Sequence, residues 1–256
     1  EYFADGFGIQ PNFWRGPNDN DYGRQQPKRE QIWKESSRDF HVADASVQMD
    51  GENAVMKVNY LLPAGNLYLM EYTVYPSGAV HVDARFTSTE MQETDTELSE
   101  ATRLATFSPG RDAARAEASK LNVPRIGVRF RLPATMNAVE YFGRGPGENY
   151  WDRNAGSPVA RYKTTAEAMY FPYVRPQENG HRTDTRWVEL SGKPGRLLIQ
   201  ADSLIEFNAL RNAVEDFDDE EQTSLPRQWS NFTPEQVADH DESKARNVLR
   251  RQHHIN

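Results

Sequence analysis

The stretch Val80-His81-Val82-Asp83-Ala84-Arg85-Phe86 alternates strictly between apolar and polar residues. Successive side chains of a β-strand point to opposite faces, so a period of two places the four apolar residues on one face and the three polar residues on the other. This stretch therefore predicts a strand with one apolar and one polar face.

The two segments before this strand repeat its pattern. Apolar residues recur at every second position in 56–62, and again, with more mixed neighbours, in 68–74. The sequences Pro63-Ala64-Gly65-Asn66 and Tyr75-Pro76-Ser77-Gly78 supply the residues that tight turns favour. Three strands joined by two short turns predict an antiparallel meander over residues 54–87.

Further short strands are expected along the rest of the chain. Four segments bounded by Pro or Gly fit this expectation: Pro124–Leu132, Asn137–Phe142, Trp187–Leu190 and Arg196–Ala201. Many short strands with such punctuation favour two sheets that share one core. We therefore expect an all-β fold, a large antiparallel β-sandwich, with residues 1–256 forming a single domain.

One or two short helices are expected outside these strands. The polar stretch 88–120 contains an Ala-, Arg- and Glu-rich part at 112–120, which suggests a surface excursion with a short helix. The sequence Thr233-Pro234-Glu235-Gln236 has the features of a capping box with proline at the first helical position.

Composition excludes several classes of function. The net charge of −8 argues against nucleic acid as a partner, because phosphate binding needs a clustered basic surface. A run of about 18 apolar residues is missing, so we expect no membrane span. The chain has no cysteine, which excludes disulfides and thiol catalysis and leaves the compartment, cytoplasm or periplasm, unassigned.

Three segments differ from ordinary strands and turns because each mixes aromatic, amide and charged residues with Gly and Pro. They are Asn12–Asp21 (NFWRGPNDND), Tyr141–Arg153 (YFGRGPGENYWDR) and Tyr170–Arg182 (YFPYVRPQENGHR). This mixture suits sugars, whose hydroxyls pair with amide, carboxylate and Arg groups while their C–H faces stack on aromatic rings. It suits equally well a buried loop network whose side chains satisfy unpaired backbone groups.

Other candidate sites are weaker. The acidic run Glu215–Glu221 lacks the Gly and the spacing of a calcium loop, so a solvated loop is the better interpretation. The six histidines, with His253 and His254 adjacent, lack zinc-like spacing. Glu148 and Glu178 are a carboxylate pair that could in principle do acid–base work on a glycosidic bond. We expect no metal site and no cofactor within the chain.

The three mixed segments resemble the C-terminal domain of glycoside hydrolase family 2 β-galactosidases. The resemblance lies in Phe13–Asp21, Gly143–Arg153 and Tyr173–Arg182, in the family's order and approximate separations. Pro124–Gly127 and Phe207-Asn208 resemble further parts of that domain. The resemblance implies a galactose mutarotase-like supersandwich. The family domain continues through a Gly-rich stretch ending in Ser-Trp, beyond the point where this chain stops.

The resemblance also implies a function. The family's enzymes remove terminal β-D-galactose, as from lactose, with retention, using two glutamates and a divalent cation such as Mg²⁺. These groups lie on an upstream (β/α)₈ barrel, so we expect no catalytic residue in this chain and no activity from it alone. Implied partners are the upstream barrel and sandwich domains, the galactoside bound by the parent enzyme, and further copies of that enzyme in a homo-oligomer.

The resemblance suggests which loops face the parent's substrate cleft. The candidate substrate-binding residues are Glu148, Asn149, Tyr150, Glu178, Asn179 and Arg182. Six others are assigned to loop and interface networks: Arg15, Asp19, Asn20, Arg144, Asp152 and Arg153. Two alternatives stay open. One is a carbohydrate-binding module with Trp14, Trp151 and Tyr173 as stacking platforms, and the other is a mutarotase-like enzyme using His181 and Glu178.

Overall fold

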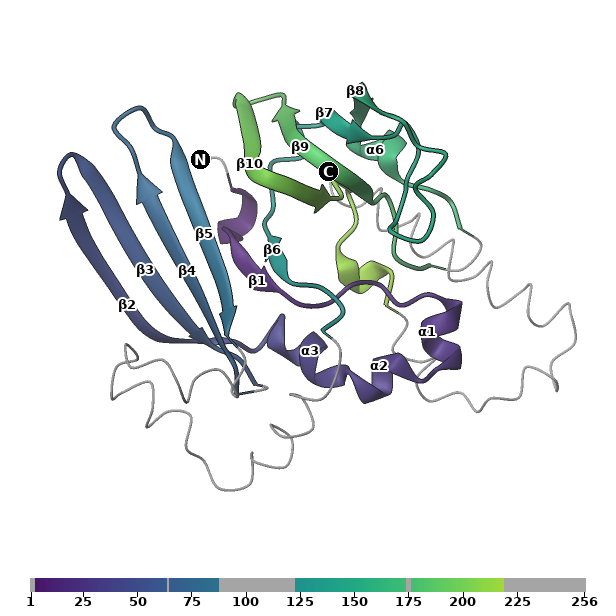
Figure 1. Cartoon of the computed structure of the whole chain (residues 1–256), viewed down its shortest axis with the longest axis horizontal. Coiled ribbons are helices and arrows are strands. Elements are labelled where there is room, and N and C mark those ends of the chain that lie inside the picture. Colours follow the sequence, from purple (N-terminus) through teal and green to yellow (C-terminus); the bar gives the residue numbers. More distant parts are fainter. Residues whose placement is uncertain (1–2, 64, 88–122, 174–175, 219–256) are drawn as a thin grey trace, which may run out of the picture. The chain divides into compact units, whose positions relative to one another are not determined.

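A computed structural model describes residues 3–63, 65–87, 123–173 and 176–218. Every strand pair in this part of the chain is antiparallel, which confirms the all-β class (Figure 1). The chain divides into two compact units. Unit 1 contains residues 1–8, 15–26 and 130–256, and unit 2 contains residues 9–14 and 27–129. The single domain expected from the sequence stays a prediction. Helices long and apolar enough to cross a membrane are absent from the described ranges.

Unit 2 is built on a four-stranded sheet in the order β2-β3-β4-β5 (Figure 1). The strands are β2 (His41–Asp50), β3 (Asn53–Leu61), β4 (Leu67–Val74) and β5 (Val80–Thr87). The predicted meander corresponds to β3, β4 and β5. In its second turn the amide of Gly78 donates to the carbonyl of Tyr75 at 2.9 Å, and Gly78 has a φ of 84°, which favours glycine.

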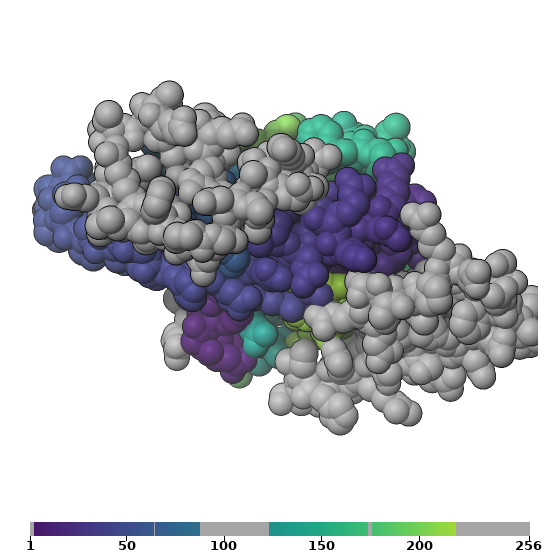
Figure 2. Space-filling view, turned by 90° about the horizontal axis from the view of Figure 1, so that it is seen from below, coloured from purple at the N-terminus to yellow at the C-terminus, as the bar shows by residue number. Residues whose placement is uncertain are grey.

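Strand β2 was not predicted. Its alternating Ala43, Ala45, Val47 and Met49 carried the same period-two signal as the meander, but most of its side chains are exposed. Figure 2 shows this segment in blue at the surface. The strand forms through its complete antiparallel pairing with β3, which includes a register shift between Val42 and Asp44.

Aromatic rings fill the core of unit 2. Phe13 lies 5.2 Å from Tyr68 and 6.1 Å from Trp33, and Trp33 lies 5.8 Å from Phe86, between ring centroids. Helix α3 (Gln31–Ser36) supplies Trp33. Strands β1 (Gln10–Asn12) and β6 (Gly127–Arg129) pair beside this core. The strand predicted over 124–132 is therefore confined to three residues.

Unit 1 is built on a second sheet, in the order β10-β9-β7-β8. The strands are β7 (Ala138–Arg144), β8 (Val159–Thr165), β9 (Arg182–Ser191) and β10 (Arg196–Phe207). Three of them were predicted, and β8 was not. Val139, Tyr141, Val188 and Leu190 form the buried core together with Met169.

Short helices occur at places that the sequence reading did not indicate. They are α1 (Asp19–Gly23), α2 (Gln26–Arg29), α3, α6 (Ala166–Met169) and the 3₁₀ turns η1 (Ala4–Gly6) and η3 (Val214–Asp216). Asn18 starts α1 through a capping box with Asp21. The Thr165 hydroxyl caps α6 by accepting from the amide of Ala168. The helices expected at 112–120 and 233–236 lie outside the described residues.

Candidate functional site

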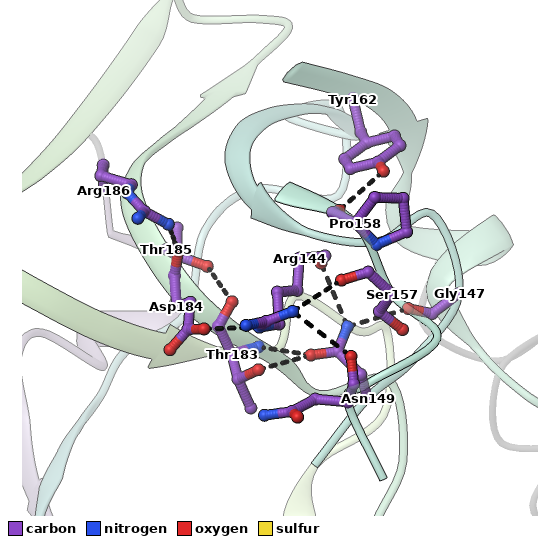
Figure 3. Close-up of polar contacts among 11 residues, drawn as sticks. Arg144, Gly147, Asn149, Ser157, Pro158, Tyr162, Thr183, Asp184, Thr185 and Arg186 are labelled. Carbon is purple, nitrogen blue, oxygen red and sulfur yellow. Dashed lines mark hydrogen bonds and ion pairs between the residues drawn. The ribbon is translucent and has the colours of Figure 1, made fainter. Parts of the chain in front are cut away.

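Asn149 anchors the loop between β7 and β8. It is fully buried, and its amide group donates to the carbonyls of Arg144 and Gly147, both at 3.1 Å (Figure 3). Its side-chain oxygen accepts from the amide and the hydroxyl of Thr183 at 3.0 and 2.6 Å. Its own amide donates to the carbonyl of His181 at 2.9 Å. This side chain therefore fixes the loop to the start of β9.

Arg144 makes a second connection between the loop and β9. Its Nε lies 2.5 Å from the carboxylate of Asp184, and its Nη1 donates to the carbonyls of Asn154 and Ser157 (Figure 3). Asp184 has a φ of 51°, an uncommon conformation outside glycine. Arg144 thus belongs to a loop network, as the sequence predicted.

Arg182 directs its guanidinium at backbone carbonyls. It is buried, and it donates to the carbonyls of Pro146, Gly180 and His181 at 2.9–3.1 Å and to the hydroxyl of Tyr141 at 2.9 Å. A buried cation surrounded by oxygen acceptors holds irregular backbone in place. The geometry gives Arg182 a structural role in the loops around it.

The first and third sequence motifs meet at Glu178. Its Oε2 accepts from the amide of Gly16 at 3.1 Å, and its own amide donates to the carbonyl of Gly16 at 3.2 Å. The side-chain amide of Asn208 donates to the carbonyl of Asn179 at 3.2 Å and to Oε1 of Glu178 at 3.4 Å. Arg15 pairs with Asp21 through two hydrogen bonds of 2.7 and 3.0 Å.

The side chain of Asn179 holds the backbone of the segment before β9 at Phe171. It is buried, its side-chain oxygen accepts from the amide of Phe171 at 2.8 Å, and its amide group donates to the carbonyl of Phe171 at 2.6 Å. One side chain thus replaces both partners that a β-ladder would offer Phe171.

Glu148 joins the second motif to the third. Its Oε2 accepts from the amide of Gly180 at 2.9 Å, and its Oε1 accepts from Arg153 at 2.7 Å and from the hydroxyl of Tyr173. Arg153 also donates to the Tyr173 hydroxyl at 2.8 Å. Burial raises the pKa of Tyr173, and its hydrogen bond to the Glu148 carboxylate acts in the same direction.

Tyr150 stacks on His181 with ring centroids 5.1 Å apart, and the guanidinium of Arg153 lies 4.5 Å from the centre of the Tyr150 ring. Burial raises the pKa of Tyr150, and the nearby carboxylates of Glu178 and Glu148 raise it further. The Tyr150 hydroxyl and Nδ1 of His181 are both buried, and neither atom has a hydrogen-bond partner among the described residues. The side-chain partner of His181 is Glu206, at 2.7 Å from Nε2.

The six candidate substrate-binding residues all lie in unit 1, in one connected set of loops. Asn149, Asn179 and Arg182 use their polar side-chain groups to hold these loops together. A substrate contact by any of the six stays a prediction.

Among the three aromatics considered as sugar platforms in that alternative, Trp14 is only 3% exposed, so it is not available as a platform. Trp14 lies in unit 2, and its burial fits a packing role. Trp151, in contrast, is 77% exposed. The described part of the chain contains no group of three or more His, Asp or Glu side chains that could hold a metal ion.

Sequence reasoning missed several members of these networks. Thr183 and Asp184 each bond a motif residue but lie outside the quoted matches, and Asn208 was noted only as part of the Phe207-Asn208 resemblance, with no role assigned. His181 was considered with Glu178, whereas its bonded carboxylate belongs to Glu206 on β10. Pairing between strands brings these residues together, and such pairing cannot be recognised from neighbouring residues in the sequence. The only sequence signal is that polar side chains occur at the ends of β9 and β10.

Comparison with known proteins shows which family the chain belongs to. The model of the family described as beta galactosidase small chain matches residues 2–240. A β-galactosidase of Priestia megaterium is 31% identical over 206 residues, which are 79% of this chain and 17% of that protein. A β-galactosidase of Streptococcus thermophilus is 26% identical over 214 residues, 81% of this chain and 18% of that protein.

A β-galactosidase of Lactobacillus delbrueckii subsp. bulgaricus is 28% identical over 192 residues, 74% of this chain and 16% of that protein. The chain thus spans less than a fifth of the length of these curated relatives. The family match includes all three motifs and both described units almost completely. The chain belongs to the beta galactosidase small chain family.

Proposed function

We propose that this chain is the C-terminal accessory part of an enzyme that hydrolyses terminal β-D-galactosides of the lactose type with retention. The match of the small-chain family over residues 2–240 carries this proposal. Two relatives named β-galactosidase, 31% identical over 206 residues and 27% identical over 188 residues, support it. The catalytic glutamates and the divalent cation, such as Mg²⁺, belong to the upstream part of the parent enzyme.

The surroundings of the two motif glutamates support a catalytic centre elsewhere. Glu148 accepts a hydrogen bond from the amide of Gly180, and Glu178 accepts one from the amide of Gly16. A retaining glycosidase needs one carboxyl group that holds a proton and a second that is free to attack the sugar. Both glutamates instead join loops, so this chain by itself is expected to be inactive.

The rigid loops support a packing role for this chain within the parent enzyme. Buried side chains hold the 145–158 loop and the segment before β9 in fixed conformations, through Asn149, Asn179 and Arg182. Loops of this kind present a preformed surface, which suits packing against the upstream barrel and sandwich domains and forming part of the wall of the substrate cleft. Binding of the galactoside and homo-oligomer formation are then properties of the assembled parent.

Hydrolysis of a chromogenic β-galactoside tests this proposal. We expect turnover from the parent enzyme, none from this chain alone, and at least a 100-fold lower rate from a parent lacking the region. A matched control is the parent carrying Glu148→Gln and Glu178→Gln together. If either glutamate were the nucleophile or acid, this control would lose activity by several orders of magnitude; if they hold loops, most activity remains. Turnover by the isolated chain that these substitutions abolish would overturn the proposal.

A further inference from the structure

Two large aromatic side chains are exposed on the loops of unit 1. Trp151, in the loop after β7, is 77% exposed, and Phe171, in the segment before β9, is 50% exposed. Single exposed apolar residues are common on protein surfaces and need no explanation. These two differ because each is attached to backbone that buried polar side chains hold in place.

The backbone beside each exposed ring is fixed from within. Asn149, two residues before Trp151, makes five hydrogen bonds to its surroundings. Phe171 has both its amide and its carbonyl bonded to the side chain of Asn179. Because the supporting residues are buried, the two aromatic side chains are presented on rigid backbone, which lowers the entropy lost when a partner binds.

The two loops are also linked to each other. Arg153 donates to Glu148 in its own loop and to the hydroxyl of Tyr173 in the other loop. The ring of Tyr173 in turn lies 4.6 Å from that of Phe171, between centroids. The two segments that carry the exposed rings are therefore joined by side-chain contacts within unit 1.

The border of this surface is polar and charged. Asp152 is exposed, and about half of the Arg153 side chain is accessible to solvent. An aromatic face beside a carboxylate and a guanidinium offers stacking to the C–H face of a pyranose ring and hydrogen bonds to its hydroxyls.

We propose that Trp151 and Phe171 form a saccharide-binding surface, with Trp151 as the stacking platform and Arg153 and Asp152 as partners for hydroxyl groups. This proposal rests on the proposed function, since the parent enzyme acts on galactosides. It places a sugar contact on the small chain outside the six candidate residues, most of whose polar groups hold the loops.

Lactose binding by the 256-residue chain tests the surface without any need for hydrolysis. Tryptophan fluorescence is quenched with iodide in the wild-type chain and in Trp151→Phe, because the chain has five tryptophans and the difference between the two proteins reports the 77% exposed Trp151. We expect lactose to reduce quenching saturably, with half of the effect in the millimolar range. Sorbitol, a polyol without a pyranose face, is the matched control and should have no effect. Calorimetric titration then provides the affinity for each variant.

Three variants locate the binding. Trp151→Ala should weaken lactose binding at least tenfold and Phe171→Ala several-fold, while Tyr75→Ala, which removes an exposed ring from unit 2, should leave it unchanged. Circular dichroism checks that each variant is folded, and substitution of an exposed ring should not unfold the chain.

Two results would overturn the proposal: no effect of lactose on the folded chain, or equal binding by Trp151→Ala. Protection from iodide that instead rises with protein concentration, with dimers in sedimentation, would reject the saccharide in favour of a second copy. A parent that needs this region for hydrolysis would still support the proposed function in each of these cases.

Discussion

Gly180 lies so close to Leu210 that a Cβ atom on Gly180 would be 2.8 Å from Cδ2 of Leu210 and 3.1 Å from the carbonyl oxygen of Met169. Gly180 also has a φ of 72°, which side-chain-bearing residues rarely adopt. Its amide is the donor to Glu148. The third motif therefore requires glycine here for two reasons, its conformation and the lack of space for a Cβ atom, while its backbone amide supplies the hydrogen bond to Glu148.

Gly180→Ala should lower the free energy of unfolding by about 2–4 kcal/mol, the sum of the left-handed backbone cost and overpacking against Leu210. Gly6→Ala is the matched control, since Gly6 has a φ of 67° but nothing within 4 Å of its added Cβ. That control should lose about 1–2 kcal/mol. Urea unfolding of both variants measures the difference, and equal losses would show that packing at Gly180 contributes nothing.

Asn149→Asp should destabilise the chain by about 2–4 kcal/mol at neutral pH. The substitution keeps the shape but places a carboxylate oxygen against the carbonyls of Arg144 and Gly147, which now accept from the Asn149 amide. The loss should shrink as pH falls and the new carboxyl group becomes protonated. Asn154→Asp in the same loop is the control, because Asn154 contacts Arg144 through its backbone carbonyl. A loss of the same size in both variants would contradict the assignment.

Glu178→Ala should cost about 1–3 kcal/mol of stability, because the buried amide of Gly16 loses its acceptor. Glu178→Gln keeps an acceptor oxygen for the Gly16 amide but loses the weaker bond from the Asn208 side chain to Oε1, so it should cost less than Glu178→Ala, about 1 kcal/mol. Thermal unfolding of the two variants distinguishes a hydrogen-bonding role from a charge-dependent one. Should the Gln variant lose as much as the Ala variant, the carboxylate charge would be the important property.

The strands were predictable wherever the local sequence alternates between apolar and polar residues. The period-two alternation in 54–87 indicated β3, β4 and β5, and the Gly78 turn followed from Pro76-Ser77-Gly78. The edge strand β2 carries the same alternation but was not predicted, and most of its side chains are exposed, so in this strand the pattern does not mark a buried face. The short helix α1 depends on one capping residue, Asn18, inside a segment that looks like a loop.

The candidate site was predictable as a set of segments but not as a set of roles. The mixture of Gly, Pro, amide and charged residues correctly indicated that the motifs are irregular and polar. It did not show that Asn149 and Arg182 point inward, nor that Trp14 is buried while Trp151 is exposed. These differences arise from pairing between strands far apart in sequence, such as β7 with β9, which one sequence does not display.

Tyr68 provides a prediction about pH. Burial raises its pKa from 10.0 to about 12, and its hydroxyl donates to the carbonyl of Gly127 at 3.2 Å. Since the folded state disfavours the phenolate, the neutral hydroxyl contributes stability in full below pH 10, and the contribution declines as pH rises from 10 toward 12. At pH 11 the wild-type chain should have lost about 1 kcal/mol of this contribution. Tyr68→Phe cannot ionise, so its stability relative to the wild type should improve by that amount between pH 9 and pH 11 in denaturant titrations. An unchanged difference between the two proteins across this range would show that Tyr68 titrates like an exposed tyrosine.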